Sequence, residues 1–443
     1  MGIQEEVKLP AKETAEAWAK ETYEVLTNLW DAGLSDAANK KGWLWGDFWK
    51  GGNTLDSVIN YYSVLKIKRE YKYIEDSYNY LFSKLPYGTG HWRDDYGWWG
   101  NAFVNAFHYI DSDEAASGLQ DNCKTAAKQC WEWLHKSANE NKTYTSTCNR
   151  SLFGEGYAAW NGGDAEAYDK ENGQCRKNPG GTYQYNCVPN SVTNLGFWAL
   201  SNGIQEFLDS DAKYLDSMRD TFDWMYTYQK SSPSLLLNKD ELIFETPNPW
   251  AHRDAHFNPD DPRGWCVDPQ RAWTADQGVF LYCALKTLKK EANQNSARAK
   301  ELTYLIKTIL WSLVMKGVIS NNYVLHEYPT DPAKMQDNNA SNFNDNYCTG
   351  PGVLMRYLGY SYPMIFGFDP NFPIQTKKLI VTTAARAWQC RDSKGIIRCW
   401  HEADIEKTKY WRFYKLASPA RELWDFAFQT AALDLFVAQL RLY

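Results

Sequence analysis

Residues 421–440 read RELWDFAFQTAALDLFVAQL, and their apolar positions recur at intervals of three and four residues. One stripe through this segment consists of Leu423, Phe426, Thr430, Leu433, Val437 and Leu440. Because an α-helix completes a turn in about 3.6 residues, this spacing places the stripe on one face and predicts a helix with one buried side. Comparable stripes occur at 302–313 and 119–133.

Extending the count along the chain predicts about twelve helices and no strand of comparable strength, although short hairpins fit in the loops. We expect the helices near residues 11–31, 53–69, 70–84, 96–110, 112–138, 190–208, 211–230, 271–290, 294–317, 351–359, 373–389 and 421–440. The sequence therefore predicts an all-α protein.

The connections between these helices alternate in length. Some are very short, as at 209–211, whereas those near 141–189, 232–270, 318–350 and 390–420 are long and rich in Gly, Pro, Asn and Asp. Long ordered loops in a compact domain usually carry function. Six hairpins with short turns at one end and long loops at the other predict an (α/α)6 barrel, a single catalytic domain over 1–443. An irregular bundle or a solenoid is the alternative, although no repeat of about 30–45 residues is visible.

Composition excludes several classes of protein. The chain has 443 residues, with 48 Lys and Arg against 54 Asp and Glu, which gives a formal net charge of −6. Aromatic residues make up 16% of the chain and include 21 Trp, so it can bury enough apolar surface to offset the entropy of ordering. The chain contains no run of about 18 uncharged apolar residues, so the sequence predicts no membrane span. The acidic balance and the lack of a basic stripe argue against a nucleic-acid partner.

The segment at 91–103, HWRDDYGWWGNAF, contains the strongest candidate for catalysis. Asp94 and Asp95 are adjacent where a Gly-containing loop enters a predicted helix, and tryptophans flank them on both sides. Two carboxyl groups this close and this enclosed should not both ionise easily, so one can act as an acid while the other acts as a nucleophile. The alternative is structural, because Asp is also favoured at helix starts.

Two further helix starts carry candidate binding residues. In GGNTLD at 51–56, the glycines would let the backbone turn, Asn53 could cap a helix or bind substrate, and Asp56 could accept hydrogen bonds from sugar hydroxyls. In WTADQG at 273–278, Trp273 offers a flat face to a sugar ring and Gln277 can both donate and accept. A tryptophan such as Trp273, taken alone, is more often a core residue.

Other chemistries have weaker support. The chain contains no Gly-rich phosphate loop and no Gly-x-Ser-x-Gly motif. His252 and His256 in HRDAH have metal-ligand spacing, but the surrounding prolines favour a loop, and no CxxC pair supports a zinc site. We therefore expect neither a metal nor a cofactor.

Cysteines and sequons favour an extracellular protein. Cys123 and Cys130 lie roughly 10 Å apart along one predicted helix, too far to form a disulfide with each other. Cys390 and Cys399 could close a small loop, and one long polar loop contains Cys148, Cys175 and Cys187. Glycosylation sequons occur, all in predicted loops, at Asn141, Asn149 and Asn339. The N-terminal segment has no apolar signal region, so a secretory signal is absent or has been removed, and the C-terminus has no hydrophobic tail for an anchor. From the cysteines and sequons we expect a secreted or cell-wall-associated protein, with a cytoplasmic one as the alternative.

Together, three segments resemble glycoside hydrolase family 76, the α-1,6-mannanase family, and indicate a divergent, fungal-type member. The matching stretches are GGNTLD at 51–56, DDYGWW at 94–99 and WTADQG at 273–278. The resemblance implies an (α/α)6 barrel and retaining cleavage of α-1,6-mannosyl bonds, with Asp94 as nucleophile and Asp95 as general acid/base. The side chains that it places in or near the glycan cleft are Asp56, Trp98, Trp99 and Gln277.

The chain also departs from the family pattern. A stretch that is usually Gly-Gly-Ile-Trp-Trp is GGTYQY at 180–185, and Asp276 replaces a neutral amide in the third segment. These changes leave three functions open: hydrolysis of α-mannan-class oligosaccharides or polysaccharides, transglycosylation at the same site, and glycan binding without turnover. We expect a monomer in each case.

Overall fold

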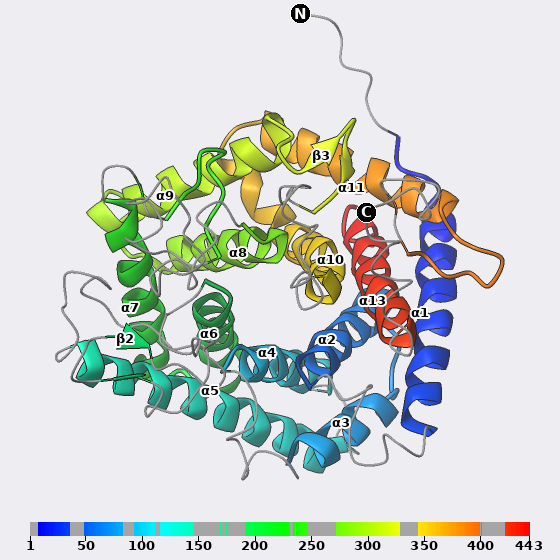
Figure 1. Ribbon diagram of the computed structural model, residues 1–443, viewed down its shortest axis with the longest axis horizontal. Coiled ribbons are helices and arrows are strands. Elements are labelled where there is room, and N and C mark those ends of the chain that lie inside the picture. Colours follow the sequence, from blue (N-terminus) through cyan, green and yellow to red (C-terminus); the bar gives the residue numbers. More distant parts are fainter. Residues whose placement is uncertain are drawn as a thin grey trace, which may run out of the picture.

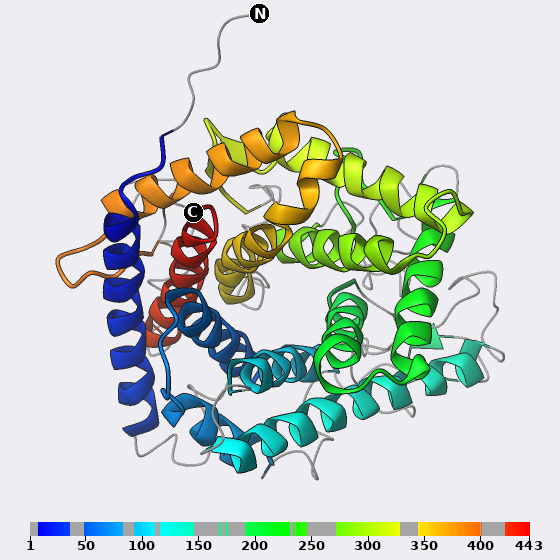
Figure 2. The ribbon, with the colours of Figure 1, turned by 180° about the vertical axis from the view of Figure 1, so that it is seen from behind.

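The structure is a computed structural model that describes residues 8–35, 48–82, 93–110, 116–145, 168–169, 174–175, 191–230, 234, 236–245, 272–327, 344–398, 400 and 421–443. Across these residues twelve α-helices form two concentric rings, seen from opposite sides in Figures 1 and 2. The inner ring consists of α2 (Phe48–Leu65), α4 (Arg93–Ile110), α6 (Ser191–Gly203), α8 (Thr274–Lys290), α10 (Asn344–Ser361) and α13 (Arg421–Leu440). The outer ring consists of α1 (Lys12–Ser35), α3 (Lys72–Phe82), α5 (Ser117–Thr145), α7 (Ala212–Gln229), α9 (Ala297–Leu310) and α11 (Asn371–Gln389).

The inner ring is closed, because α13 packs against both α10 and α2. Outer and inner helices alternate along the chain (Figure 1), so the six hairpins predicted from the connection lengths are confirmed. Inner helices lead to outer ones through short links such as 66–71, 209–211 and 291–296, and the long segments return to the starts of inner helices. The starts of the inner helices therefore lie at the long-connection end of the barrel, and their last turns lie at the short-connection end.

The first and last helices lie side by side. Helix α1 packs along α13, and the Tyr443 hydroxyl donates a hydrogen bond to the carbonyl oxygen of Pro10. The two ends of the described chain therefore meet at one point of the outer wall.

Two helix starts differ from the predictions. Helix α2 begins at Phe48, so Gly51 and Gly52 lie inside the helix and do not form a turn before it. The reason is close packing, because a Cβ atom on Gly52 would lie 2.8 Å from the backbone nitrogen of Trp99 in α4. Helix α10 begins at Asn344, about two turns before the predicted start, and contains Pro351 inside it.

The short hairpins expected in the loops are present. Strands β1 (Tyr168–Asp169) and β2 (Gln174–Cys175) pair antiparallel, as do β3 (Ser320–Asn321) and β4 (Val324–Leu325). One of the predicted loop sequons was misplaced, because α5 runs on to Thr145 and includes residue 141. The other two sequons, at 149 and 339, lie outside the described residues.

Of the cysteines in the described part of the chain, Cys123, Cys130 and Cys283 are buried free thiols. Cys123 and Cys130 are separate buried thiols on α5, as their spacing predicted, and burial raises the pKa of both above the ordinary range. The proposed partner of Cys390, residue 399, lies outside the described residues, as do residues 148 and 187. None of the helices in the described ranges is long and apolar enough to cross a membrane.

Candidate active site

The two adjacent carboxyl groups lie in the first turn of α4, at the long-connection end of the barrel. Asp95 is 5% exposed, whereas Asp94 is only partly buried. On a helix, residues four apart share a face, so Asp94 is aligned with Trp98 and Asp95 with Trp99. The unpaired backbone N–H groups of a first helical turn also favour negative charge there. The chain thus presents one enclosed and one more accessible carboxyl group side by side.

Three tryptophans form a cluster across the barrel axis at this end. Trp49 of α2, Trp98 of α4 and Trp273, which immediately precedes α8, have ring centroids 5.7–6.3 Å apart. Helices α2 and α8 stand on opposite sides of the inner ring (Figure 1), so this contact bridges the ring. Trp49 retains the most accessible surface of the three, while Trp98 and Trp273 are 8% and 7% exposed. This tryptophan cluster forms an aromatic surface at the end where Asp94 and Asp95 lie.

Trp99, which the resemblance placed in or near the glycan cleft, is fully buried. Its indole Nε1 donates to the carbonyl oxygen of Phe48 at 2.8 Å, and its ring packs against Phe48 and Phe103. In this position it fixes α4 against α2. Stacking on a sugar would require this packing to open.

Asn53 and Asp56 belong to a buried charge cluster inside the barrel. The fully buried Arg356 of α10 contacts Asp56 Oδ2 through Nη1 at 2.5 Å and Asp434 of α13 through Nε and Nη2 at 2.8 and 2.6 Å. Nη2 also donates to Asn53 Oδ1 at 2.8 Å, while Asn105 donates to Asp56 Oδ1 at 2.6 Å. Both oxygens of Asp56 are therefore held by protein groups, and a direct bond to sugar would have to displace one of them.

Gln277 and Asp276 lie in α8 and are both buried. The side-chain amide of Gln277 accepts from the backbone nitrogen of Ile243 at 2.8 Å and donates to the carbonyl oxygens of Ile243 and Trp273 at 3.0 and 3.1 Å. Gln277 thereby ties the segment 236–245 and Trp273 to the start of α8. Both the oxygen and the nitrogen of its side-chain amide therefore form hydrogen bonds with backbone groups and do not point toward a ligand.

Glu327 is a residue of this region that the sequence did not identify. It is 6% exposed, and its carboxylate accepts hydrogen bonds from the backbone nitrogen of Thr274, at 2.8 Å, and from the Thr274 hydroxyl. A Cβ atom on Gly350 would lie 2.4 Å from Glu327 Oε2 and 2.5 Å from Trp273 Nε1, so the carboxylate and the indole face the same glycine. Glu327 thus anchors the start of α8 beside the tryptophan cluster. It comes from a long loop 53 residues away, so no local pattern could reveal it.

Several candidates lie outside the described residues, namely Trp92, which precedes the carboxyl pair, the HRDAH segment and the divergent stretch at 180–185. In the part of the chain that the structure describes, no group of three or more His, Cys, Asp or Glu side chains is placed to hold a metal ion.

Comparison with known proteins supports the fold and not a specific activity. No family model matches the chain, and no curated protein matches it. Among solved structures, the GH76A α-1,6-mannanase from Salegentibacter sp. HEL1_6 is similar with a TM-score of 0.58 and 12% identity, over 95% of this chain and 98% of that chain. A family 76 glycoside hydrolase from a bovine Bacteroides thetaiotaomicron strain is similar with a TM-score of 0.56 and 13% identity, over 96% of this chain and 76% of that chain. A possible GH105 family member from Salmonella enterica is similar with a TM-score of 0.52 and 11% identity, over 100% of this chain and 97% of that chain.

An inactive variant of the Salegentibacter enzyme, with two consecutive aspartates changed to asparagine, is also similar, and it is in complex with α-1,6-mannotriose. Identities this low establish shared architecture only. The chain therefore has the (α/α)6-barrel fold that carbohydrate-active enzymes such as family 76 mannanases also have.

Proposed function

We propose that this protein is a retaining glycoside hydrolase that cleaves α-1,6-mannosidic bonds in mannan or mannose-containing glycans. The observation that carries the proposal is the Asp94–Asp95 pair, placed in the first turn of inner helix α4 at the long-connection end of the barrel. The tryptophan cluster at the same end offers apolar ring faces to a sugar.

Each carboxyl group has a role that suits its surroundings. The more accessible Asp94 attacks the anomeric carbon while Asp95, whose burial favours the neutral form, protonates the departing glycosidic oxygen. Asp95 then removes a proton from the water that breaks the glycosyl–Asp94 bond, which restores both groups. Retaining enzymes hold these carboxyl groups about 5–5.5 Å apart, a separation that neighbouring side chains can span.

The comparison supports the same two residues. The similar mannanase was made inactive by changing two consecutive aspartates, and its variant binds α-1,6-mannotriose. In this chain a consecutive pair stands at the start of an inner helix of the same fold. The family resemblance of the sequence segments points to the same substrate class.

The proposal is tested by incubating the protein with α-1,6-mannan and mannooligosaccharides and following products by NMR. We expect new reducing ends that first appear as the α-anomer, because two successive inversions retain the configuration. The double variant Asp94→Asn/Asp95→Asn is the matched control, and it should bind mannotriose without cleaving it. Longer oligosaccharides formed when acceptor is added would identify transglycosylation. Binding by wild type with no products of either kind would leave only a glycan-binding role.

Trp49→Ala tests the tryptophan cluster. Removing an aromatic contact worth about 0.5–1.5 kcal/mol should raise KM about 3- to 10-fold and change kcat little, provided that the contact is made equally in substrate and transition state. Trp311→Ala is the matched control, since Trp311 is 45% exposed on the outer ring. Equal KM values for the two variants would remove the cluster from the substrate site.

A further inference from the structure

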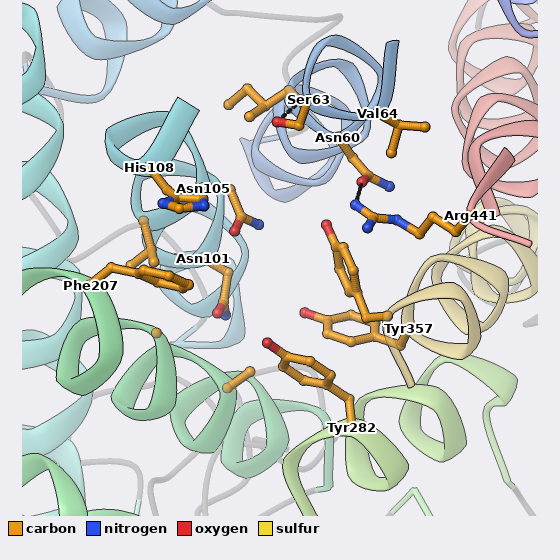
Figure 3. Close-up of a pocket in the computed structure, with 15 residues that line it drawn as sticks. Asn60, Ser63, Val64, Asn101, Asn105, His108, Phe207, Tyr282, Tyr357 and Arg441 are labelled. Atoms are coloured by element: carbon orange, nitrogen blue, oxygen red, sulfur yellow. Dashed lines mark hydrogen bonds between the residues drawn. The ribbon is translucent and has the colours of Figure 1, made fainter. Parts of the chain in front are cut away.

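A cavity opens at the short-connection end of the barrel, opposite the end with Asp94 and Asp95. Its volume is about 330 Å³, near the lower limit of small-molecule pockets (about 300–1,000 Å³). It is lined by α2, α4, α6, α8 and α10 and by the residue that directly follows α13 (Figure 3), and its polar lining consists of Asn60, Ser63, Asn101, Asn105, His108, Tyr282, Tyr357, Tyr360 and Arg441. None of these side chains belongs to the site proposed above.

The cavity is separated from the catalytic end by distance and by charge. Its α4 residues, 101–108, lie about 10–21 Å along the helix from Asp94, at about 1.5 Å per residue. The buried Arg356 cluster lies between, and Asn105 connects the two because it lines the cavity and donates to Asp56 at 2.6 Å. A ligand here would not reach the carboxyl pair.

The cavity presents hydrogen-bonding groups that the protein leaves unused. The hydroxyl groups of Tyr282, Tyr357 and Tyr360 form no hydrogen bond with any described residue. Asn60 at the cavity wall is 2% exposed, and its Oδ1 accepts from Arg441. The three tyrosine hydroxyls are therefore the groups available to donate and accept hydrogen bonds with a ligand.

The arrangement of these groups indicates a ligand with many hydroxyls. In Figure 3 the hydroxyl ends of Tyr282 and Tyr357 point into the cavity, and the amides of Asn101 and Asn105 face them from α4. Hydroxyls donate and accept, and so do amides, which matches a polyol. The tyrosine rings also pack on one another, with centroids 5.4–5.7 Å apart, which fixes the positions of the hydroxyls.

The charges around the cavity favour a neutral ligand. Burial raises the pKa of Tyr357 and Tyr360, and the nearby Asp56 carboxylate adds to the effect, so both hydroxyls stay protonated. The negative charge of Asp56 would also repel an anion bound at the floor of the cavity. At the rim, the Arg441 guanidinium already contacts Asn60 and lies 4.5 Å from the centre of the Tyr360 ring.

We propose that this cavity is a second binding site, for a neutral polyhydroxylated ligand about the size of one sugar ring. The volume corresponds to about eleven water molecules at ~30 Å³ each. The rings of His108 and Phe207, with centroids 4.5 Å apart and planes tilted by 30°, form one wall against which a ring face can lie. The proposal does not depend on the catalytic assignment.

The test uses saturation-transfer NMR and crystal soaking on the full chain carrying Asp94→Asn/Asp95→Asn. The probes are methyl α-D-mannoside, myo-inositol and, as an anion, glucuronate. We expect the neutral probes to bind and glucuronate not to bind. A pyranoside that binds while inositol does not would identify a sugar as the natural ligand, and the reverse would identify a free polyol.

In the Asp94→Asn/Asp95→Asn protein, the additional changes Tyr282→Phe and Tyr357→Phe remove only two hydroxyls that have no protein partner. Folding should therefore be unchanged, and the affinity for the neutral probes should fall about 10-fold or more. Ala199→Leu, which adds volume at the cavity wall, should abolish binding, whereas Tyr304→Phe on the exposed face of α9 should change nothing. The proposal is overturned if no neutral probe binds, if glucuronate binds more tightly, or if the double Tyr variant binds as before.

Discussion

Asp94→Asn is expected to lower the rate of α-1,6-mannoside cleavage by at least about 10²–10⁴-fold, because an amide cannot form the glycosyl ester that the proposed mechanism requires. The variant should fold normally, since Asn also suits the first turn of a helix. The measurement is kcat/KM on a mannooligosaccharide, compared with Asp216→Asn on the exposed face of outer helix α7, which should match wild type. Turnover within a few-fold of wild type would remove Asp94 from the nucleophile role.

Added azide can distinguish the two carboxyl groups. In Asp94→Ala, azide takes the place of the missing nucleophile and attacks once, so the product is the inverted β-mannosyl azide. On a substrate whose leaving group departs without protonation, such as a dinitrophenyl mannoside, the glycosyl–Asp94 bond still forms in Asp95→Ala, and azide opens it in a second inversion that gives the retained α-azide. The reverse pattern would exchange the two assignments, and rescue of neither variant would contradict both.

Arg356→Met is expected to destabilise the protein by about 3–5 kcal/mol, the largest effect on stability that the structure predicts. Met has a similar length, but it leaves the Asp56 and Asp434 carboxylates in the barrel interior without their cation. The measurement is the denaturation midpoint in guanidinium. Arg298→Met is the matched control, because Arg298 pairs with the exposed Asp223 on the outer ring and should cost about 1 kcal/mol or less.

The loss of stability in Arg356→Met should be larger at neutral pH than at acidic pH. Burial raises the pKa of Asp434 above its ordinary value even though Arg356 opposes this, so the folded protein holds this proton more tightly than the unfolded chain. The contribution of such a group to stability is complete below its unfolded pKa, about 3.9, and is lost as pH rises through its folded pKa. Without Arg356 the folded pKa should rise further, so the variant should lose more stability at pH 7 than at pH 4.5.

Neutralising the remaining charges provides the second check. Arg356→Met/Asp56→Asn/Asp434→Asn should recover part of the lost stability and remove most of the pH dependence, since no charge then remains in the cluster. A destabilisation that is independent of pH and unaffected by the two Asn changes would show that Arg356 acts through packing alone.

The fold was predictable because it depends on patterns formed by residues close together in the sequence. A stripe at helical spacing, such as the one in 421–440, depends only on neighbouring residues, and the alternation of short and long connections then orders the helices into a ring. The error at Gly51 and Gly52 came from the same local view. Paired glycines usually mark a turn, whereas here they let two helices approach closely, which depends on Trp99 about fifty residues away.

The candidate site was predictable only where its residues are consecutive. Asp94 and Asp95 are visible as a pair, but the charged partner of Asp56 is Arg356, 300 positions away along the chain, which also binds Asp434. Its acidic side chain was therefore interpreted as a sugar ligand. A fully buried arginine in a helix has no sequence signal that distinguishes it from an exposed one, so the charge cluster required the three-dimensional arrangement.

The contact between Tyr443 and Pro10 has a consequence for the topology of the chain. Because α1 packs along α13, the last hairpin contacts the first, and no hairpin has to come first for the ring to close. A circularly permuted chain, with a short linker joining these ends and new termini opened in a link such as 291–296, would retain every helix contact in both rings. The six hairpins therefore form a closed circle of contacts, in which several links are equivalent places for a new pair of termini.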